Sequence, residues 1–431
     1  MKKFSVLLFF LLGVMSCVAD YDVLPSYYDN QVNQKGQRIN DFEGKALFVY
    51  FTDTHVDANR GHSPAIIKDM LKTCNLQYVF WGGDAISAYG NGISIEWKKQ
   101  EKMFDVISPY CQLCLVRGNH DFTYKDKQTD EGYTYSQREV TDKLSAYMSS
   151  DVVSNKSVPD ACYYYIDDYI NKMRYIVFDT NDSGTYGDVA WGYKYTIGDE
   201  QISWIAREAI LTTPPQYSIV LFSHVPLNTQ FNTSYKNVDK LTKAVLNKKE
   251  VTINGSVYDF SKMNEGTRLI CIMSGHIHHD MQLYSNGLLQ ITTASDAFYS
   301  DYKRSPFSSF VSARERNSET DQVVEVCKYD EKQNVFAMFR IGYGGDRYFH
   351  IIPIKMKVGE KMNLEIRYIT PVGYGCYTSK SEYKSKQWTL YDDVLNVNSE
   401  GLVIAKNVGE SVVYARSADG IMEFYDVIVE K

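Results

Sequence analysis

The sequence predicts an α/β layered domain followed by a smaller all-β domain. From residue 45, short apolar strands alternate with amphipathic helices in units of about 30 residues, which is typical of strands joined through helices. After residue 322 the helical pattern stops, and apolar and polar residues alternate with glycine at the turns. The chain has 431 residues, 44% of them hydrophobic, so it is long enough to bury more than one core. Its net charge of −7 gives it no built-in attraction for nucleic acid or anionic lipid.

The amino terminus has the pattern of a secretory signal. Two lysines precede an apolar run, residues 4–15, that is too short to span a bilayer. Residues 1–16 are therefore expected to be a signal peptide, and Cys17 resembles the lipidated first residue of a bacterial lipoprotein. Ordinary cleavage after Ser16 or Ala19 is the alternative. Both interpretations predict an exported protein, and lipidation would attach it to the bacterial outer membrane, at the cell surface or in the periplasm.

Residues 17–43 are interpreted as an extension or linker that precedes the layered domain. Within the layered domain, each apolar strand ends at a polar or glycine-containing turn. Strands are predicted at residues 46–51, 78–81, 113–116, 163–166, 174–178, 219–223, 269–274 and 288–293. Helices are predicted at residues 64–74, 93–107, 199–210 and 238–247, and a closing hairpin at residues 323–329 and 335–341. Open α/β sheets bind their ligands beyond the carboxyl ends of strands, so functional residues are expected at these ends.

Five of the strand ends carry side chains that bind metal ions. In chain order, the motifs are Asp53-Thr54-His55, Gly83-Asp84, Gly118-Asn119-His120-Asp121, Ser223-His224 and Gly275-His276-Ile277-His278. Imidazole and carboxylate groups bind borderline divalent ions such as Zn, Mn and Fe. Each motif alone is a weak signal. All five in this order, each directly after an apolar strand, indicate a single metal site.

The order of these motifs resembles that of the calcineurin-like metallophosphoesterases, over residues 44–348. The resemblance implies a four-layer α/β sandwich, with two sheets flanked by helices, and a site for two metal ions, expected to be Mn, Fe or Zn. One ion would be bound by Asp53, His55, Asp84 and His278. The other would be bound by Asp84, Asn119, His224 and His276. Asp84 would thus bridge the two ions.

The resemblance also implies an activity, the hydrolysis of phosphomonoester or phosphodiester bonds. A hydroxide that bridges the two ions would attack phosphorus in line, and His120 would protonate the leaving group as general acid. Asp121 is placed to orient His120, or alternatively caps the following turn. The expected substrates are phosphorylated small molecules, nucleotides or lipid head groups. The alternative function, from another class, is a surface adhesion or glycan-binding lipoprotein whose phosphoesterase fold is inactive.

Further residues are candidates for the surroundings of this site. Asp57 is placed to support His55, and His279 is expected to be solvated or to support a ligand. Some aromatic residues are candidates to stack a base or sugar, although most such residues belong to cores: Tyr124, Tyr133, Tyr135, Tyr186, Trp191, Tyr193 and Tyr195. The segment 295–321 is expected to be a phosphate-binding loop or a mobile surface loop, with the basic residues Lys303, Arg304, Arg314 and Arg316.

Residues 352–431 show period-two alternation with glycine at the turns, which predicts a small β-sandwich. The spacing resembles that of bacterial Ig-like group 2 domains. Such domains usually act as spacers or adhesive units, which would bring this region into contact with a cell surface or a glycan. The alternative is a stabilising appendage that packs on the enzyme. No catalytic residue is expected here.

Overall fold

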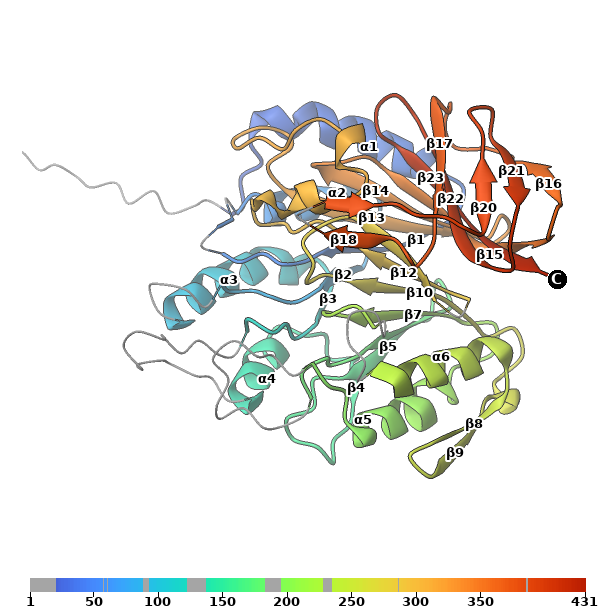
Figure 1. Ribbon diagram of the computed structural model, residues 1–431. Helices are drawn as coiled ribbons and strands as arrows, with labels where there is room; N and C mark the ends of the chain where they lie inside the picture. The colour runs from blue at the N-terminus through green and yellow to red at the C-terminus, as the bar shows by residue number, and fades with distance from the viewer. Residues whose placement is uncertain are drawn as a thin grey trace, which may run out of the picture.

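The computed structural model describes residues 21–56, 58–59, 61–87, 93–121, 137–182, 195–227, 235–285, 287–384 and 387–431. Within these ranges, two β-sheets face each other and helices cover their outer surfaces (Figure 1). This arrangement confirms the predicted four-layer α/β sandwich with an additional all-β region. The predicted signal peptide, residues 1–16, and Cys17 lie outside the described residues, as does Asp57.

The larger sheet has nine strands in the order β17-β22-β23-β15-β14-β13-β1-β2-β3. Its first-domain strands are β1 (Lys45–Phe51), β2 (Tyr78–Trp81), β3 (Gln112–Leu115), β13 (Val323–Asp330), β14 (Val335–Gly342) and β15 (Arg347–Lys357). Its later strands are β17 (Gly373–Tyr377), β22 (Gly409–Arg416) and β23 (Met422–Glu430). Strands β1, β2 and β3 are parallel, so their carboxyl ends lie along one edge of the sheet.

The second sheet has seven strands in the order β11-β12-β10-β7-β6-β5-β4. These strands are β4 (Val153–Ser154), β5 (Tyr164–Asp168), β6 (Met173–Val177), β7 (Ser218–Ser223), β10 (Arg268–Ser274), β11 (Met281–Ser285) and β12 (Leu288–Thr292). Strands β6, β7, β10 and β12 run parallel to one another. Smaller sheets are formed by β8 (Glu250–Ile253), β9 (Ser256–Asp259), β16 (Lys361–Asn363), β18 (Glu382–Lys384), β19 (Gln387–Thr389), β20 (Leu395–Val397) and β21 (Leu402–Ala405).

Helices cover the outer faces of both sheets. The layers of sheet and helix enclose three hydrophobic cores. The helices are α1 (Asp29–Asp41), α2 (Ser63–Thr73), α3 (Ile93–Ile107), α4 (Gln137–Ser145), α5 (Asp199–Trp204), which continues as a π-helical stretch (Ile205–Ile210), and α6 (Lys236–Asn247). One core lies between α1–α4 and the larger sheet, a second between the two sheets, and a third between the smaller sheet and the α5–α6 layer. The predicted strands and helices agree with the observed ones to within two residues at each end.

Residues 21–43 belong to the layered domain, although the sequence suggested an extension or linker. Tyr28 and Ile39 are buried in the core beneath α1. The Tyr28 hydroxyl accepts a hydrogen bond from the backbone N–H of Gln322 at 3.0 Å, and Lys35 pairs with the buried Asp346 at 2.5 Å. These contacts fix α1 on the outer face of the larger sheet.

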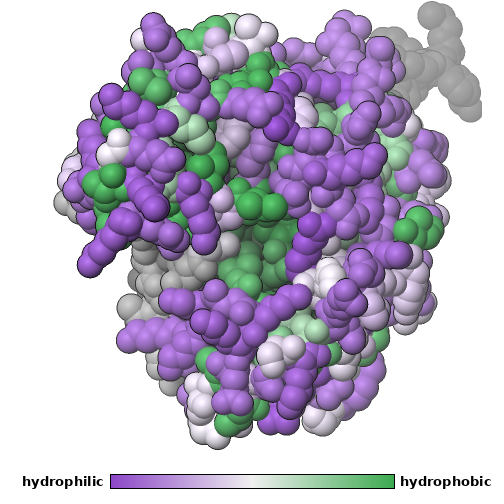
Figure 2. Space-filling model, turned by 90° about the vertical axis from the view of Figure 1, so that its right-hand side faces the viewer, coloured by the Kyte–Doolittle hydropathy of each residue, from purple (hydrophilic) through white to green (hydrophobic). Residues whose placement is uncertain are grey.

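The carboxy-terminal strands extend the larger sheet. Strand β15 continues across the predicted boundary between residues 348 and 352, and β23 pairs with it in parallel from Arg347–Met422 to Lys357–Glu430, with a register irregularity between His350 and Ile354. Side chains of this region enter the core between the two sheets, where Phe424 stacks on Phe349 with ring centroids 5.1 Å apart. A second cluster lies on the other face of β22 and β23. Figure 2 shows the side of the molecule that carries these strands, with apolar side chains gathered in a central hollow.

Among the described residues, no helix combines the length and the apolar character that crossing a membrane requires.

Asp426 connects β23 to β11 through a buried hydrogen bond, whose contribution to stability can be measured. Its Oδ1 accepts a hydrogen bond from Gln282 Nε2 at 2.9 Å, and its side chain is buried. Burial raises the pKa of Asp426 well above its ordinary value, so the folded protein retains a proton that the unfolded chain releases above about pH 4. The stability that this proton contributes is present at the acid end of the range and is lost as the pH rises through the folded pKa.

We therefore expect the Asp426→Asn variant to gain thermal stability relative to the wild type as the pH rises from about 4.5 to 8. Each kcal/mol corresponds to roughly 2–4 °C in Tm for a domain of moderate size. Differential scanning fluorimetry of both proteins across this pH range measures the effect, and a Tm difference that does not change with pH would contradict it.

Candidate metal centre

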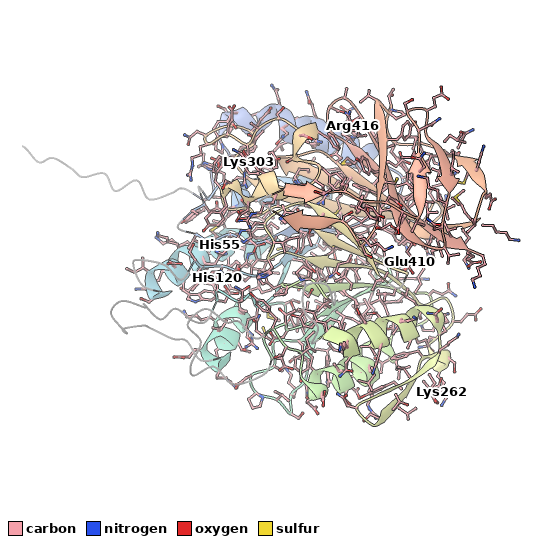
Figure 3. The ribbon with its side chains drawn as sticks, viewed as in Figure 1. His55, His120, Lys262, Lys303, Glu410 and Arg416 are labelled. Atoms are coloured by element: carbon pink, nitrogen blue, oxygen red, sulfur yellow. The ribbon has the colours of Figure 1, made fainter. Side chains whose placement is uncertain are left out.

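The five sequence motifs meet where the carboxyl ends of the two sheets come together. Asp53 and His55 follow β1, Asp84 follows β2, and Asn119 and His120 follow β3 in the larger sheet. His224 follows β7, while His276 and His278 follow β10 in the smaller sheet. Figure 3 shows His55 and His120 next to each other, and their ring centroids are 5.1 Å apart. The site therefore lies between the two sheets at one edge.

Five of the predicted ligand residues have a left-handed backbone conformation, which residues other than glycine rarely adopt. Their φ angles are positive at Asp53 (53°), His55 (37°), Asp84 (55°), His276 (69°) and His278 (59°). Such conformations cost of the order of 1–3 kcal/mol each and persist where the surrounding structure imposes them. With this backbone conformation, these residues bring their side chains together in the shared space.

Two motif glycines are needed because the ligand residues approach their backbone closely. A Cβ atom added to Gly118 would lie 2.2 Å from the backbone nitrogen of Asp84 and 2.3 Å from its Oδ1. A Cβ atom added to Gly275 would lie 2.5 Å from Oδ2 of Asp53. Neither neighbour is free to move without displacing a ligand.

One group of ligand atoms is formed by Asp53, His55, Asp84 and His278, whose donor atoms all lie within 4.8 Å of one another. Nε2 of His55 lies 3.2 Å from Nε2 of His278, which in turn lies 3.3 Å from Oδ1 of Asp53. Ring nitrogens this close together, beside a carboxylate, are arranged as ligands around one cation.

A second group is formed by Asp84, His224 and His276, again with donor atoms within 4.8 Å. Oδ1 of Asn119 lies 3.0 Å from Nε2 of His224, so the amide belongs to the same cluster. Asp84 takes part in both groups. Its buried Oδ2 lies 3.2 Å from Nε2 of His224 and 3.7 Å from Nε2 of His55, one histidine from each group. A buried acceptor of this kind fits a position shared by two cations.

The histidine rings are oriented by contacts at Nδ1. Nδ1 of His55 lies 3.1 Å from the carbonyl oxygen of Ile86, and Nδ1 of His224 lies 2.8 Å from that of Gly82. Because a carbonyl oxygen can only accept, each Nδ1 carries the proton and Nε2 faces the ligand cluster. His276 is flanked by Tyr195, whose ring meets it edge-on at 5.0 Å.

The protonation of the ligands follows from their burial and from the two carboxylates. Burial lowers the pKa of His55 and of His276 to about 3, so both are neutral. Burial also disfavours charge on His224 and His278, but Asp84 raises the pKa of His224 to about 9 and Asp53 raises that of His278 to about 10. Each ligand group therefore holds one protonated and one neutral histidine in the metal-free protein, and cations would replace those protons.

His120 and Asp121 lie beside the ligand groups. The backbone N–H of His120 donates to Oδ1 of Asp84 at 2.8 Å, and its Nδ1 lies 3.1 Å from the carbonyl oxygen of Ser87. Asp121 instead accepts from the backbone N–H groups of Ala85 at 2.7 Å and Gly118 at 2.6 Å. These bonds join the second motif to the third. The side chain of Asp121 thus links the loops that follow β2 and β3, while the carbonyl oxygen of Ser87 lies beside the His120 ring.

Expectations for the surrounding residues need two corrections. Arg314 does not offer a phosphate clamp, because it is buried and donates to the backbone carbonyl groups of residues 295, 296, 297 and 321. His279 is not solvated: its ring is buried, with Nδ1 2.5 Å from the carbonyl oxygen of Ile277. The aromatic candidates Tyr124, Tyr133, Tyr135, Tyr186, Trp191 and Tyr193 lie outside the described residues.

Two residues near the ligands were not singled out by the sequence. The ring of Tyr299 stacks on His278 at 5.4 Å with an angle of 9° between the planes. Asp301 lies 3.2 Å from Nδ1 of His278 through its Oδ2. Both belong to the segment 295–321, which was a candidate phosphate-binding loop because of its basic residues. No sequence motif indicates a role for Tyr299 or Asp301.

The fold and the site together define an α/β protein with donor sets for two metal ions where its two sheets meet. The calcineurin-like phosphoesterase family matches residues 46–280, and the chain belongs to this family. No curated protein matches it by sequence.

Similar folds occur in solved structures of low sequence identity. A dimetal phosphatase from Danio rerio is 14% identical, with a TM-score of 0.46, over 70% of this chain and 97% of its own. The phosphopantetheinyl hydrolase of Mycobacterium tuberculosis is 10% identical, with a TM-score of 0.32, over 58% and 91% of the two chains. The GAP50 anchor of the Plasmodium inner membrane complex is 12% identical, with a TM-score of 0.34, over 68% and 83%. At TM-scores below 0.5, these similarities add nothing to the family assignment.

A methyl group at Gly118 should disrupt the centre. We expect Gly118→Ala to push Asp84 out of position, to cost about 1–3 kcal/mol of stability and to lower the metal content of the purified protein. Metal analysis by mass spectrometry measures the loss. Gly373→Ala is the matched control, because its added methyl meets only the flexible end of Arg416, 3.1 Å away. Equal metal content in the two variants would contradict the expected crowding.

Proposed function

We propose that the chain is an exported two-metal phosphoesterase that hydrolyses phosphomonoester or phosphodiester bonds. The observation that carries the proposal is the position of Asp84, whose buried carboxylate belongs to both ligand groups and lies near a histidine of each, His55 and His224. When bound, the two cations supply Lewis-acid activation of water and neutralise charge on the phosphoryl oxygens. Mn, Zn and Fe all suit a set of imidazole, carboxylate and amide donors.

The proposed role of His120 is to protonate the leaving-group oxygen. Its Nδ1 proton is held by the carbonyl oxygen of Ser87, which leaves Nε2 as the nitrogen that exchanges a proton with the substrate. Its backbone is fixed to Asp84 by a hydrogen bond of 2.8 Å. The ring is therefore held beside the ligand groups. Imidazole is suited to this exchange near neutral pH.

The ligand residues follow strands of both sheets, so the substrate would approach from the edge where these strands end. Tyr195 and Tyr299 flank this edge on the His276 and His278 sides and are half-buried. Rings in such positions would contact the part of the substrate beyond the phosphate. We propose a phosphorylated small molecule, nucleotide or lipid head group as substrate.

Export and anchoring are proposed from the amino-terminal sequence. The support is the short apolar run after two lysines, followed by Cys17 as a lipidation site. The expected location is the bacterial outer membrane, the cell surface or the periplasm.

For residues 352–431 we propose a stabilising role as the main function, with any contact to a cell surface or glycan made through their outer face. What supports this choice is the packing of Tyr377, Tyr414 and Phe424 in the core between the two main sheets. The spacing of the strands resembles that of Ig-like domains, but the pairing of β23 with β15 joins them to the enzyme's own sheet.

Chelation and loss of Asp84 should have the same effect on activity. We expect the metal-loaded protein to hydrolyse chromogenic monoester or diester substrates in the presence of Mn, Zn or Fe, and we expect chelator to abolish this activity. The Asp84→Ala variant should be inactive at every metal concentration, because both ions lose a ligand. If the loaded wild type hydrolysed neither kind of ester, the inactive adhesion lipoprotein would become the better interpretation.

His120→Ala separates chemistry from metal binding. Because the residue lies outside both ligand groups, we expect the variant to keep the metal content of the wild type. Loss of a general acid typically lowers kcat by about 10²–10⁴-fold. Substrates with good leaving groups, which need no proton, should lose less than substrates with poor ones. An equal loss for both kinds of substrate would argue against the general-acid role.

A further inference from the structure

The support of His278 differs in kind from that of the other oriented ligands. At His55 and His224, Nδ1 is held by a neutral backbone carbonyl group. At His278 the partner is a carboxylate, with Oδ2 of Asp301 3.2 Å from Nδ1. A carboxylate accepts the same hydrogen bond but also carries a negative charge, so it increases the electron-donating strength of the ring at Nε2.

Asp301 is itself held in place from the other side. Nη2 of Arg304 lies 2.8 Å from Oδ1 of Asp301, so its two oxygens are divided between an arginine and a histidine. Both residues belong to a short 3₁₀ helix, Ser300–Arg304. Within it, Tyr302 is buried against Tyr343 at 4.6 Å. Just after it, Ser305 donates to the carbonyl oxygen of Asp280 at 2.8 Å.

The ring of His278 is also restrained at its face. Tyr299 stacks on it nearly parallel, at 5.4 Å, and meets His55 edge-on at 5.2 Å. Figure 3 shows Lys303, from the same 3₁₀ helix, above His55. The segment 299–304 thus touches the site at the side of the first ligand group. A hydrogen bond and a stacked ring together leave Nε2 of His278 directed at Asp53, 3.3 Å away.

We infer that Asp301 is a positioning residue for the metal ion bound by Asp53, His55, Asp84 and His278, acting through Nδ1 of His278. The inference rests on the proposed function, because it requires that the first ligand group binds an ion. Asp301 fixes the tautomer of His278, holds its Nε2 toward the ion and strengthens that nitrogen as a donor. The second ion, bound through His224 and His276, has no carboxylate support of this kind among the described residues and should not depend on Asp301.

The test is a calorimetric titration of metal-free protein with Mn²⁺ or Zn²⁺ alone. For Asp301→Asn we expect one of the two dissociation constants to rise about 10–100-fold, as for other partners of metal-binding histidines. The other constant should stay within about twofold of the wild type. Asp301→Glu, which restores the carboxylate, should recover part of the lost affinity. The Tm of the metal-free variants shows whether folding is affected.

Asp259→Asn is the matched control. Asp259 is also about one-quarter exposed, 27% against 25% for Asp301, and it pairs with Lys262 three residues later as Asp301 pairs with Arg304. It lies far from the site, and Figure 3 shows Lys262 at the opposite end of the molecule from His55. Its removal should leave both dissociation constants unchanged.

A double-mutant cycle separates positioning from a general structural role. In a His278→Ala background, Asp301→Asn should have no further effect on either constant, because the residue through which it acts is missing. A similar loss in both backgrounds would overturn the inference, as would unchanged affinities in the single variant or a collapse of its metal-free Tm. Wild-type protein that binds two ions but cleaves no ester would refute the proposed function alone. Wild-type protein that cleaves esters, with Asp301→Asn binding both ions normally, would refute only the role of Asp301.

Discussion

Two carboxylates, Asp53 and Asp84, are buried together where the two sheets meet, and the rest of the site is arranged around the charge that they carry. Unpaired charge is costly away from water, and two like charges in one small space are costlier still. Four imidazoles surround them. In the metal-free protein the carboxylates raise the pKa of His224 and His278, so that these two rings carry compensating protons. Two divalent cations would provide more positive charge at the same positions, which makes metal binding the natural resolution of an arrangement that is otherwise unfavourable.

The fold imposes this arrangement from several sides. Parallel strands of both sheets end at the same edge, and left-handed backbone conformations turn the ligands inward. Behind the last motif, Asp280 accepts from Arg340 at 2.8 Å, and Glu325 accepts from Arg347 at 2.6 Å. All four charged groups lie in one network, in which Arg340 also contacts Glu325. Removing one partner of such a network leaves a buried charge uncompensated. The loop that carries His276 and His278 is therefore tied to β13, β14 and β15.

The sequence predicted most strands of the layered domain and placed the candidate ligands at their ends, because both signals are local, but it missed helices α1 and α4. Strand periodicity is readable over six or seven residues, and each motif directly follows its strand. Contacts between side chains that are far apart in the sequence leave no such local signal. Nothing near residue 301 in the sequence indicates that Asp301 faces His278, and nothing near Arg314 shows that its side chain turns inward toward carbonyl groups. The continuation of β15 past residue 352 was missed for a related reason, since a glycine-punctuated run of strands looks the same whether it forms its own sheet or extends another. The contacts of Asp121 likewise depend on a neighbour from another motif, Ala85.

Strand β15 joins the carboxy-terminal strands to the charged network behind the metal-binding loop. Arg347, at its start, joins the charged network behind the metal-binding loop, and its later residues pair with β23. A module joined through a linker would leave that strand free to move at one end. Here both ends are fixed, one by buried ion pairs and the other by the parallel ladder, while Phe349 and Phe424 stack between them. Strand β15 thus links the carboxy-terminal strands to Arg347 and to the charged network behind the loop that carries His278. The all-β region is in this sense part of the scaffold of the metal centre, even though it contributes no ligand to it.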